Sequence, residues 1–311
     1  MKIAIIGGGI CGLYLSWKLK EKNNEVVVFE AKNNIGDNVV CSGLFSSRIL
    51  KFLPQSERLI RNRINYVLIH FPQKTIKVTF SKPFLVMCHS ELDQLAGEIA
   101  KNSGVEINLN NSIKIMPSGF DRIVGCDGFN SFVRRNMGLK EPEYRLGIQG
   151  FTSNKSTSDF VEVWPSEEKD GFIWKIPRGD ETEYGIMGSP ESAREKFRIF
   201  LAENNIKIGE LKSKVIPQGF ILPSHDSITL CGDAMGLTKP WSGGGVIWGL
   251  TASKILVDNI DNLHEYNRKA KRFFSFKIFR SKLMVKLVYF FGFKMPWIMP
   301  KKAKIESDFL L

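Results

Sequence analysis

The sequence predicts a mixed α/β protein in which a nucleotide-binding α/β domain is interrupted by an antiparallel-sheet domain and followed by a basic helical segment. Three observations lead to this prediction. The first thirty residues alternate strand, glycine turn, helix and strand, residues 145–188 form short alternating strands, and the excess positive charge lies near the C-terminus. With 311 residues and 43% hydrophobic composition, the chain can bury one large core or two linked ones.

The first element in the chain is a βαβ unit with a dinucleotide-binding pattern. An apolar strand, an amphipathic helix and a β-branched strand are expected at 2–6, 13–22 and 25–30. The first turn has the spacing GxGxxG, in which Gly7 allows the turn, Gly9 admits a pyrophosphate and Gly12 lets the helix pack on the strand. The helix N-terminus offers amides to phosphates, and Glu30, 23 residues after Gly7, can accept both ribose hydroxyls of an adenosine.

The rest of the chain is not a simple βα array, which argues against a plain nicotinamide dehydrogenase. A hairpin is expected at 64–80, and four short strands within 145–188 indicate an antiparallel sheet. Further strands and helices are expected at 84–88, 91–102, 105–109, 192–204 and 228–231. The predicted domains are therefore a discontinuous cofactor-binding domain at 1–63, 81–140 and 219–262, a substrate-binding antiparallel-sheet domain at 64–80 and 141–218, and a basic amphipathic segment at 263–311.

The net charge of +12 is confined to one segment. Twelve basic and no acidic residues lie between Arg268 and Lys304, and the remaining chain holds 32 of each sign. The basic residues alternate with aromatic and aliphatic ones, which favours a helix lying on an anionic membrane surface over nucleic-acid binding. Lys286 and Lys294 interrupt the most apolar part, so no transmembrane helix is expected. A helix pair packed on its own domain is the alternative.

The number and spacing of the cysteines and histidines argue against a disulfide-stabilised protein and against a metalloprotein. The five cysteines form no CxxC pair, which argues against a disulfide framework or a structural metal site and favours a reducing cytoplasm. The four histidines have no metal-ligand spacing, so no metal site is predicted. The apolar start runs at once into glycines, so no signal peptide is expected. The expected location is the cytoplasmic face of a membrane, with the protein bound peripherally.

Two motifs resemble those of the para-hydroxybenzoate-hydroxylase-like flavoproteins. An apolar strand ending in Asp127-Gly128 before a helix resembles their DG motif. The run 228–236, which contains Asp233 and Ala234, resembles their second flavin motif, whose aspartate hydrogen-bonds the ribityl chain of FAD. The resemblance implies an FAD-binding, Rossmann-like domain with Asp127, Asp233 and Ala234 at the cofactor.

The next stretch, 237–250, is similar to the geranylgeranyl reductase family, which includes the archaeal digeranylgeranylglycerophospholipid reductases. Pro240 and the run Gly243, Gly244 and Gly245 stand where that family has P and GGG. Such a turn opening a helix aims amides at the flavin edge that is negative when reduced. The matches extend from residue 3 to about residue 250, and they imply FAD as cofactor.

Two further segments resemble the substrate side of this family. Residues 40–44, VCSGL, match its cysteine-containing loop, and FIWKIP at 172–177 resembles its YxWxFP strand, whose aromatics line the prenyl pocket. Cys41 is therefore the candidate catalytic proton donor, with a small buried cysteine as the alternative. The candidate substrate-binding residues are three aromatic side chains: Phe172, Trp174 and Trp241.

The sequence departs from the family at several positions. His89 stands where an arginine that contacts FAD is usual, and Phe172 and Ile176 make the strand motif FxWxIP, which is also close to the WxWxIP of flavin-dependent halogenases. The chain also stops near residue 311, whereas many family members carry a longer C-terminal domain.

The resemblance implies hydrogenation of isolated double bonds on a geranylgeranyl-type prenyl lipid, with hydride from flavin N5. A second GxGxxG after a strand is missing, so no permanent nicotinamide site is expected. The electron donor would be NAD(P)H or a ferredoxin-like protein. The alternatives are a flavin monooxygenase or halogenase acting on a small hydrophobic or aromatic substrate, and a non-catalytic FAD-binding membrane protein.

Overall fold

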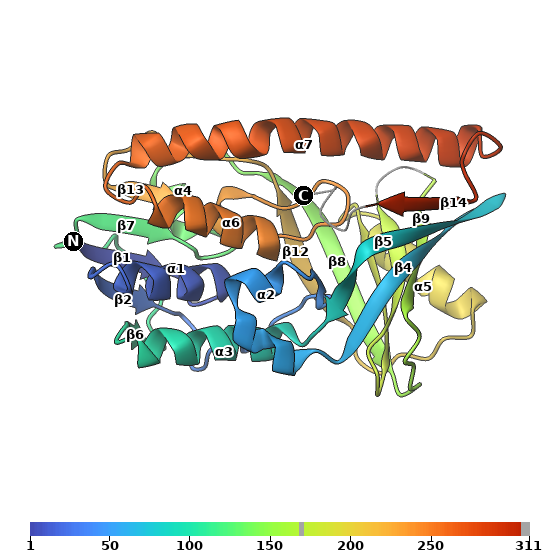
Figure 1. Ribbon diagram of the computed structural model, residues 1–311, viewed down its shortest axis with the longest axis horizontal. Coiled ribbons are helices and arrows are strands. Elements are labelled where there is room, and N and C mark those ends of the chain that lie inside the picture. Colours follow the sequence, from blue (N-terminus) through green and yellow to red (C-terminus); the bar gives the residue numbers. More distant parts are fainter. Residues whose placement is uncertain (168–170, 306–311) are drawn as a thin grey trace.

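Two sheets form the frame of the molecule, and a long helix runs along both (Figure 1). The computed structural model describes residues 1–167 and 171–305. Residues 168–170 of the predicted sheet domain and 306–311 of the predicted basic segment lie outside the described residues.

The first sheet is parallel and carries the nucleotide-binding pattern. Its order is β13-β7-β1-β2-β6, and every pairing in it is parallel. The strands are β1 (Lys2–Ile6), β2 (Glu25–Phe29), β6 (Glu106–Asn108), β7 (Arg122–Gly125) and β13 (Ile228–Leu230). The helices of this domain are α1 (Ile10–Lys20), α2 (Ile49–Phe52), α3 (His89–Asn102), α4 (Phe132–Asn136) and α6 (Val246–Val257). Short 3₁₀ turns occupy Pro54–Leu59 and Gly232–Met235.

The second sheet is mostly antiparallel and curls at the other end of the molecule (Figure 1). Its order is β12-β8-β11-β10-β9-β4-β5-β14, with β3 also paired to β5. The strands are β3 (Leu44–Ser46), β4 (Asn62–Phe71), β5 (Lys74–Val86), β8 (Glu143–Thr152), β9 (Phe160–Pro165), β10 (Phe172–Pro177), β11 (Thr182–Gly188), β12 (Lys212–Gln218) and β14 (Lys302–Ile305). Helix α5 (Ala193–Glu203) covers this sheet by burying Phe197 against Ile148 and Ile186.

Two expectations for this sheet need correction. The hairpin spans 62–86 rather than 64–80, and the strand expected separately at 84–88 is the end of β5. A register shift between Ile64 and Tyr66 lets the long pair continue past the point where the apolar pattern suggested a break.

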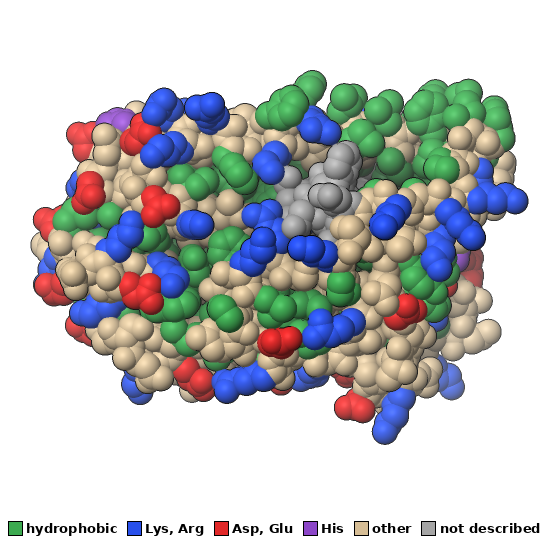
Figure 2. All heavy atoms as spheres, viewed as in Figure 1, with side chains coloured by type: hydrophobic (Ala, Val, Ile, Leu, Met, Phe, Trp, Pro, Cys, Tyr) green, Lys and Arg blue, Asp and Glu red, His purple; other side chains and the backbone are tan. Residues whose placement is uncertain are grey.

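The C-terminal segment forms one helix, α7 (Leu263–Lys294), and then the short strand β14, rather than a helix pair. The side chain of Asn262 caps α7 by accepting a hydrogen bond from the amide of Glu265 at 3.1 Å. One face of α7 packs on the chain, burying Tyr266, Ala270 and Phe274 completely, and apolar and basic side chains gather along its exposed side (Figure 2). Within 1–167 and 171–305, no helix is long and apolar enough to cross a membrane.

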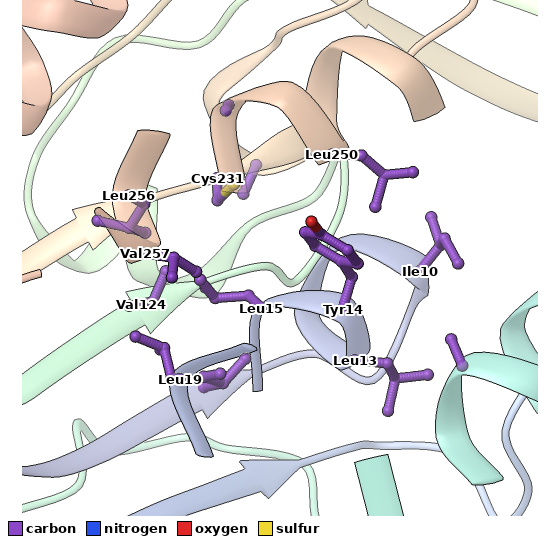
Figure 3. Packing of buried hydrophobic residues seen from close by; sticks show 14 of the residues in the cluster. Ile10, Leu13, Tyr14, Leu15, Leu19, Val124, Cys231, Leu250, Leu256 and Val257 are labelled. Atoms are coloured by element: carbon purple, nitrogen blue, oxygen red, sulfur yellow. The ribbon is translucent and has the colours of Figure 1, made fainter. Parts of the chain in front are cut away.

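The main core lies where α1 packs between the parallel sheet and α6 (Figure 3). Leu13, Leu15 and Leu19 are fully buried, as are Leu250 and Leu256 of α6. Gly12 allows this close packing, because a Cβ there would lie 2.1 Å from the carbonyl oxygen of Gly7. Burial of large aliphatic side chains stabilises such a core by about 1.5–3 kcal/mol each, and it fixes the glycine turn at the start of α1.

Candidate active site

A cavity of about 530 Å³ lies beside the glycine turn and the start of α1. Both sheets contribute to its wall: Gly9 and Cys11 come from the turn and α1, His89 from α3, Lys214 from β12 and Gly245 from the N-terminus of α6. The predicted cofactor residues Gly9, Asp233 and Gly245 are among its lining.

The glycine turn fits a bound pyrophosphate. At Gly7, φ is +109° and a Cβ would lie 2.4 Å from the carbonyl oxygen of Cys126, so only glycine is tolerated there. At Gly9 a Cβ would meet nothing within 4 Å, which leaves open space at the helix N-terminus. Helix α1 has neither a capping side chain nor an acidic residue in its first turn, so its amides remain available to an anion.

Glu30 is placed at the end of β2, as the pattern predicts. Its carboxylate accepts hydrogen bonds from the amide of Gly8 at 2.6 Å and from the amide of Lys32 at 2.9 Å. These two contacts orient the carboxylate next to the glycine turn, where it can accept further hydrogen bonds from a ribose.

The two motif aspartates have different surroundings. Asp127 accepts a hydrogen bond from the amide of Val133 through Oδ2, whereas its Oδ1 is buried with no partner among the described residues. Asp233 lines the cavity and lies 3.7 Å from the ammonium group of Lys214. Burial alone would lower the pKa of Lys214, but the negative charges of Asp233, Cys41 and Asp93 together raise it. The unpartnered Oδ1 of Asp127 can accept a hydrogen bond from a polar ligand, and the carboxylate of Asp233 can do the same from the cavity wall.

The second glycine-rich turn brings the N-terminus of α6 to the cavity. Gly243 has φ of +67°, and Gly245 leaves room for Asp233, because a Cβ at Gly245 would lie 2.7 Å from Oδ1 of Asp233. Helix α6 has no capping side chain and no acidic residue in its first turn. The carbonyl groups of the remaining predicted residues accept hydrogen bonds that support the turn. The carbonyl of Gly244 accepts one from the amide of Lys239, and the carbonyl of Pro240 accepts one from the side chain of Gln218. The carbonyl of Ala234 accepts one from the guanidinium of Arg134.

A buried ionisable group joins Cys41 to the cavity. Nε2 of His89 lies 3.3 Å from Oδ1 of Asp93, and His89 and Asp93 both line the cavity. Burial alone would lower the pKa of His89, but the charge of Asp93 and the interaction with Cys41 raise it to about 10. Burial alone would raise the pKa of the Cys41 thiol, but the charge and hydrogen bond of His89 lower it. Cys41, His89 and Asp93 therefore influence one another's protonation, and we call these three residues the thiol–imidazole group.

The loop carrying Cys41 lies between the cavity and the curled sheet. The side chain of Gln149 on β8 donates to the carbonyl of Cys41 at 3.2 Å, and Arg178 donates to the carbonyl of Ser42 at 2.6 Å. The same guanidinium reaches the carbonyl of Met87, just before α3, at 3.1 Å. Arg178 thus ties the cysteine loop and the start of the His89 helix to one strand end.

Arg178 also joins this loop to the aromatic strand β10. It contacts the fully buried carboxylate of Glu183 at 2.8 Å, and Glu183 accepts a hydrogen bond from the indole of Trp174 at 2.8 Å. Burial raises the pKa of Glu183 to about 8, against the opposing effect of Arg178. The indole of Trp174 is consequently held in one orientation.

The three predicted substrate-binding aromatics do not line the cofactor cavity. Phe172 and Trp174 lie 5.9 Å apart in the smaller core of the curled sheet, together with Ile64 and Met187. Trp241 lies in the second glycine-rich turn, and its indole nitrogen is buried with no partner among the described residues.

Three thiols lie on the cavity wall next to the first turn: Cys11, Cys126 and Cys231. Cys126 and Cys231 follow the neighbouring strands β7 and β13, and both line the cavity while also packing in the main core. Burial raises the pKa of Cys11 well above its usual value, which keeps this thiol neutral.

Fold and site together define a class. Residues 5–42 match the family model described as an NAD(P)-binding Rossmann-like domain. The glycine turn, Glu30 and the second glycine-rich turn fit FAD, and the class is that of FAD-dependent oxidoreductases in which a Rossmann-like parallel sheet is joined to a curled antiparallel sheet. The predicted fold class and the predicted cofactor are confirmed.

Two relatives found by sequence similarity cover most of the chain. The chain is 27% identical to an uncharacterized protein of Methanocaldococcus jannaschii, over 89% of this chain and 81% of that protein. It is 22% identical to the digeranylgeranylglycerophospholipid reductase of Methanothrix thermoacetophila, over 84% of this chain and 78% of the reductase. These matches confirm the resemblance to the geranylgeranyl reductases.

Solved structures share the fold. A geranylgeranyl bacteriochlorophyll reductase-like protein from Thermoplasma acidophilum superposes with a TM-score of 0.80 at 17% identity, over 93% of this chain and 87% of that one. The flavin-dependent halogenase CmlS superposes with a TM-score of 0.76 at 18% identity, over 99% of this chain and 68% of that one. One fold therefore accommodates both enzyme types.

Sequence analysis missed several residues of the wall. His89 was noted only as a replacement for an arginine, whereas the structure places it on the cavity wall, where it interacts with Cys41. Asp93, four residues later on α3, is the one available signal, since positions i and i+4 share a helix face. Lys214 carries no local signal, because its strand is far from the glycine turns in sequence.

Proposed function

We propose that the protein reduces isolated double bonds of geranylgeranyl-type isoprenoid lipids. The observation that carries this proposal is the thiol–imidazole group at the cavity, because alkene reduction needs a proton as well as a hydride. The digeranylgeranylglycerophospholipid reductase named among its relatives acts in that chemical class, and this supports the choice of lipid.

FAD, held by the two glycine-rich turns and Glu30, would supply the hydride for this reduction. An unconjugated alkene is a poor hydride acceptor, so the protein must hold it in close and correct geometry. Arg178 contributes by fixing both the Cys41 loop and, through Glu183, the indole of Trp174. Phe172, Trp174 and Trp241 do not line the cofactor cavity, so these aromatic side chains are proposed to contact the prenyl chain beyond it.

Cys41 is proposed to give a proton from Sγ to the second alkene carbon. Its lowered pKa makes the thiol a better acid, and the imidazolium of His89 can return the proton afterwards. Asp93 holds His89 in its charged form. Lys214 and the N-terminus of α6 add positive potential on the cofactor side, where reduced flavin is negative.

The second candidate is a flavin monooxygenase or halogenase acting on a small hydrophobic or aromatic substrate. The FxWxIP strand β10 and the fold shared with a halogenase favour it. It requires oxygen, whereas the reductase does not. Under either reaction, NAD(P)H or a ferredoxin-like protein is proposed as the external electron donor.

The test follows the absorbance of bound, chemically reduced flavin without oxygen. A digeranylgeranylglycerophospholipid in detergent is added, and the lipid is then analysed by mass spectrometry. Reoxidation together with a gain of hydrogen pairs by the lipid is the result expected. A saturated lipid of the same head group is the control.

Flavin that stays reduced until air is admitted would reject the reductase reaction with this lipid and favour oxygen chemistry. A protein that holds flavin but turns over neither with lipid nor with oxygen would favour the non-catalytic alternative.

A further inference from the structure

One side of α7 exposes an unusual row of apolar side chains. Five of them recur at spacings of three and four residues and are 39% to 64% exposed: Phe276, Phe279, Leu283, Leu287 and Phe290. This spacing places them in one stripe along the helix. Just after α7, Trp297 is 70% exposed and Ile298 is 54% exposed. We call these seven residues the α7 ridge.

The ridge lies opposite the face by which α7 binds the rest of the chain. Phe274, Ser281 and Gly292 are buried on that inner face. Gly292 allows close contact, because a Cβ there would lie 2.1 Å from the ring of Phe71. Helix α7 is therefore packed firmly on the rest of the chain by its inner face, and the exposed row lies on its outer face.

The far end of α7 is fixed in place. The hydroxyl of Tyr289 donates to the carbonyl of Gly171 at 2.6 Å, and the ammonium group of Lys74 donates to the carbonyl of Pro296 at 3.0 Å. Strand β14 then pairs with β5. These contacts hold Trp297 and Ile298 in an ordered turn, so exposing them needs no conformational change.

Basic side chains accompany the ridge. Lys282, Lys286 and Lys294 are exposed on α7, and no acidic residue occurs anywhere between Arg268 and Lys304. Figure 2 shows hydrophobic side chains gathered over the C-terminal half of α7, with Lys and Arg side chains around them. Apolar area next to one sign of charge matches a surface that is both apolar and negative.

We propose that the α7 ridge docks on the surface of an anionic lipid bilayer. Phe, Leu and Trp side chains would enter the boundary between head groups and acyl chains, about 5–10 Å deep, while the lysines meet anionic head groups. The helical part of the ridge, from Phe276 to Phe290, is about 21 Å long at 1.5 Å per residue, so the contact follows the C-terminal half of α7 (Figure 1). A second copy of the chain is the weaker occupant, because pairing two such faces brings like charges together.

The test is flotation of the holoenzyme with vesicles of phosphatidylcholine alone, or of phosphatidylcholine mixed with phosphatidylglycerol. We expect binding to the anionic vesicles that weakens with salt. The variant Phe279→Glu/Leu283→Glu should lose it, whereas Ile115→Glu, at a position 83% exposed elsewhere, should bind like the wild type. Bound FAD checks that each variant is folded.

A second set of variants separates charge from apolar contact. Lys282→Gln/Lys286→Gln/Lys294→Gln should weaken binding to anionic vesicles on the order of 100-fold. The matched control removes three exposed lysines elsewhere, Lys51, Lys101 and Lys114, and should change binding little.

Two results would overturn the proposal: wild-type protein that ignores anionic vesicles, or ridge variants that bind them as well as the control. A lipid-free dimer that Phe279→Glu dissociates, without vesicle binding, would assign the ridge to a second copy instead. The readout needs neither substrate nor turnover, so failure of the proposed reaction would leave this inference untouched.

Discussion

The two walls of the cavity are built in different ways. The cofactor wall consists of backbone: two glycine-rich turns, each opening a helix that has no side-chain cap. The other wall consists of ionisable side chains: His89 and Asp93 on α3 line the cavity, and Cys41 interacts with His89 from a nearby loop. Backbone recognition depends on local sequence, whereas the ionisable wall depends on how the two sheets meet. Substitutions on the cofactor wall should therefore lower FAD affinity, whereas substitutions on the ionisable wall should slow the reaction.

The largest effect is expected on the ionisable wall. Cys41→Ala or His89→Gln should slow lipid-driven flavin reoxidation by about 10²–10⁴-fold, the usual contribution of a positioned acid, while FAD content stays unchanged. His89→Arg keeps a positive charge but cannot relay a proton near neutral pH, so it should also be slow. Stopped-flow absorbance measures the rate.

The matched control is His264→Gln, which removes an exposed histidine 2.7 Å from Asp226. It should react at the wild-type rate. A fast His89→Arg enzyme would show that His89 supplies charge alone and that the proton comes from elsewhere.

The next effect concerns the cofactor wall. Gly9→Val should fold normally, since a Cβ at Gly9 meets nothing within 4 Å, yet it should fill the space of the pyrophosphate. We expect FAD affinity to fall on the order of 100-fold, or about 3 kcal/mol. Flavin fluorescence titration measures it, and Gly209→Val, where the space is also open, is the control. Undiminished FAD binding by Gly9→Val would contradict the placement of the cofactor.

A smaller loss should follow from Glu30→Gln. The amide keeps one acceptor oxygen, but the charged hydrogen bonds to the Gly8 amide and to a ribose weaken. We expect FAD affinity to fall about tenfold, corresponding to about 1.4 kcal/mol, with the melting temperature of the apoprotein little changed. A loss as large as that of Gly9→Val would show that Glu30 supports the turn rather than the ribose.

The smallest effect concerns how the stability that His89 contributes changes with pH. The pKa of His89 in the folded protein, about 10, is above its unfolded value, so its stabilising contribution is complete below about pH 6.5 and is lost as pH rises through about 10. Asp93 and Cys41 face this group. Thermal unfolding should show the wild type losing its advantage over His89→Gln by a few degrees between pH 7 and 10. Parallel curves would contradict the charged state of His89.

The sequence was a good guide where structure is local. The βαβ unit, Glu30 at the end of β2 and the helix after Gly245 follow from short-range spacing, and all are present. It was a poorer guide at the hairpin, because the bulge near Ile64 lets β4 and β5 continue to residue 86. The strand β14 was not anticipated, since its partner β5 lies more than two hundred residues earlier in the chain.

The candidate site likewise contains a part that follows from local sequence and a part that depends on long-range contacts. Sequence alone determined the cofactor turns, because a φ near +109° at Gly7 and close helix packing at Gly12 are requirements that only glycine meets. Tertiary structure alone decided that Cys41 interacts with His89, because the pKa of each depends on burial and on a charge brought from another element. The thiol and the imidazole are 48 positions apart in the sequence, so they influence each other's pKa only after folding has buried them and brought them together.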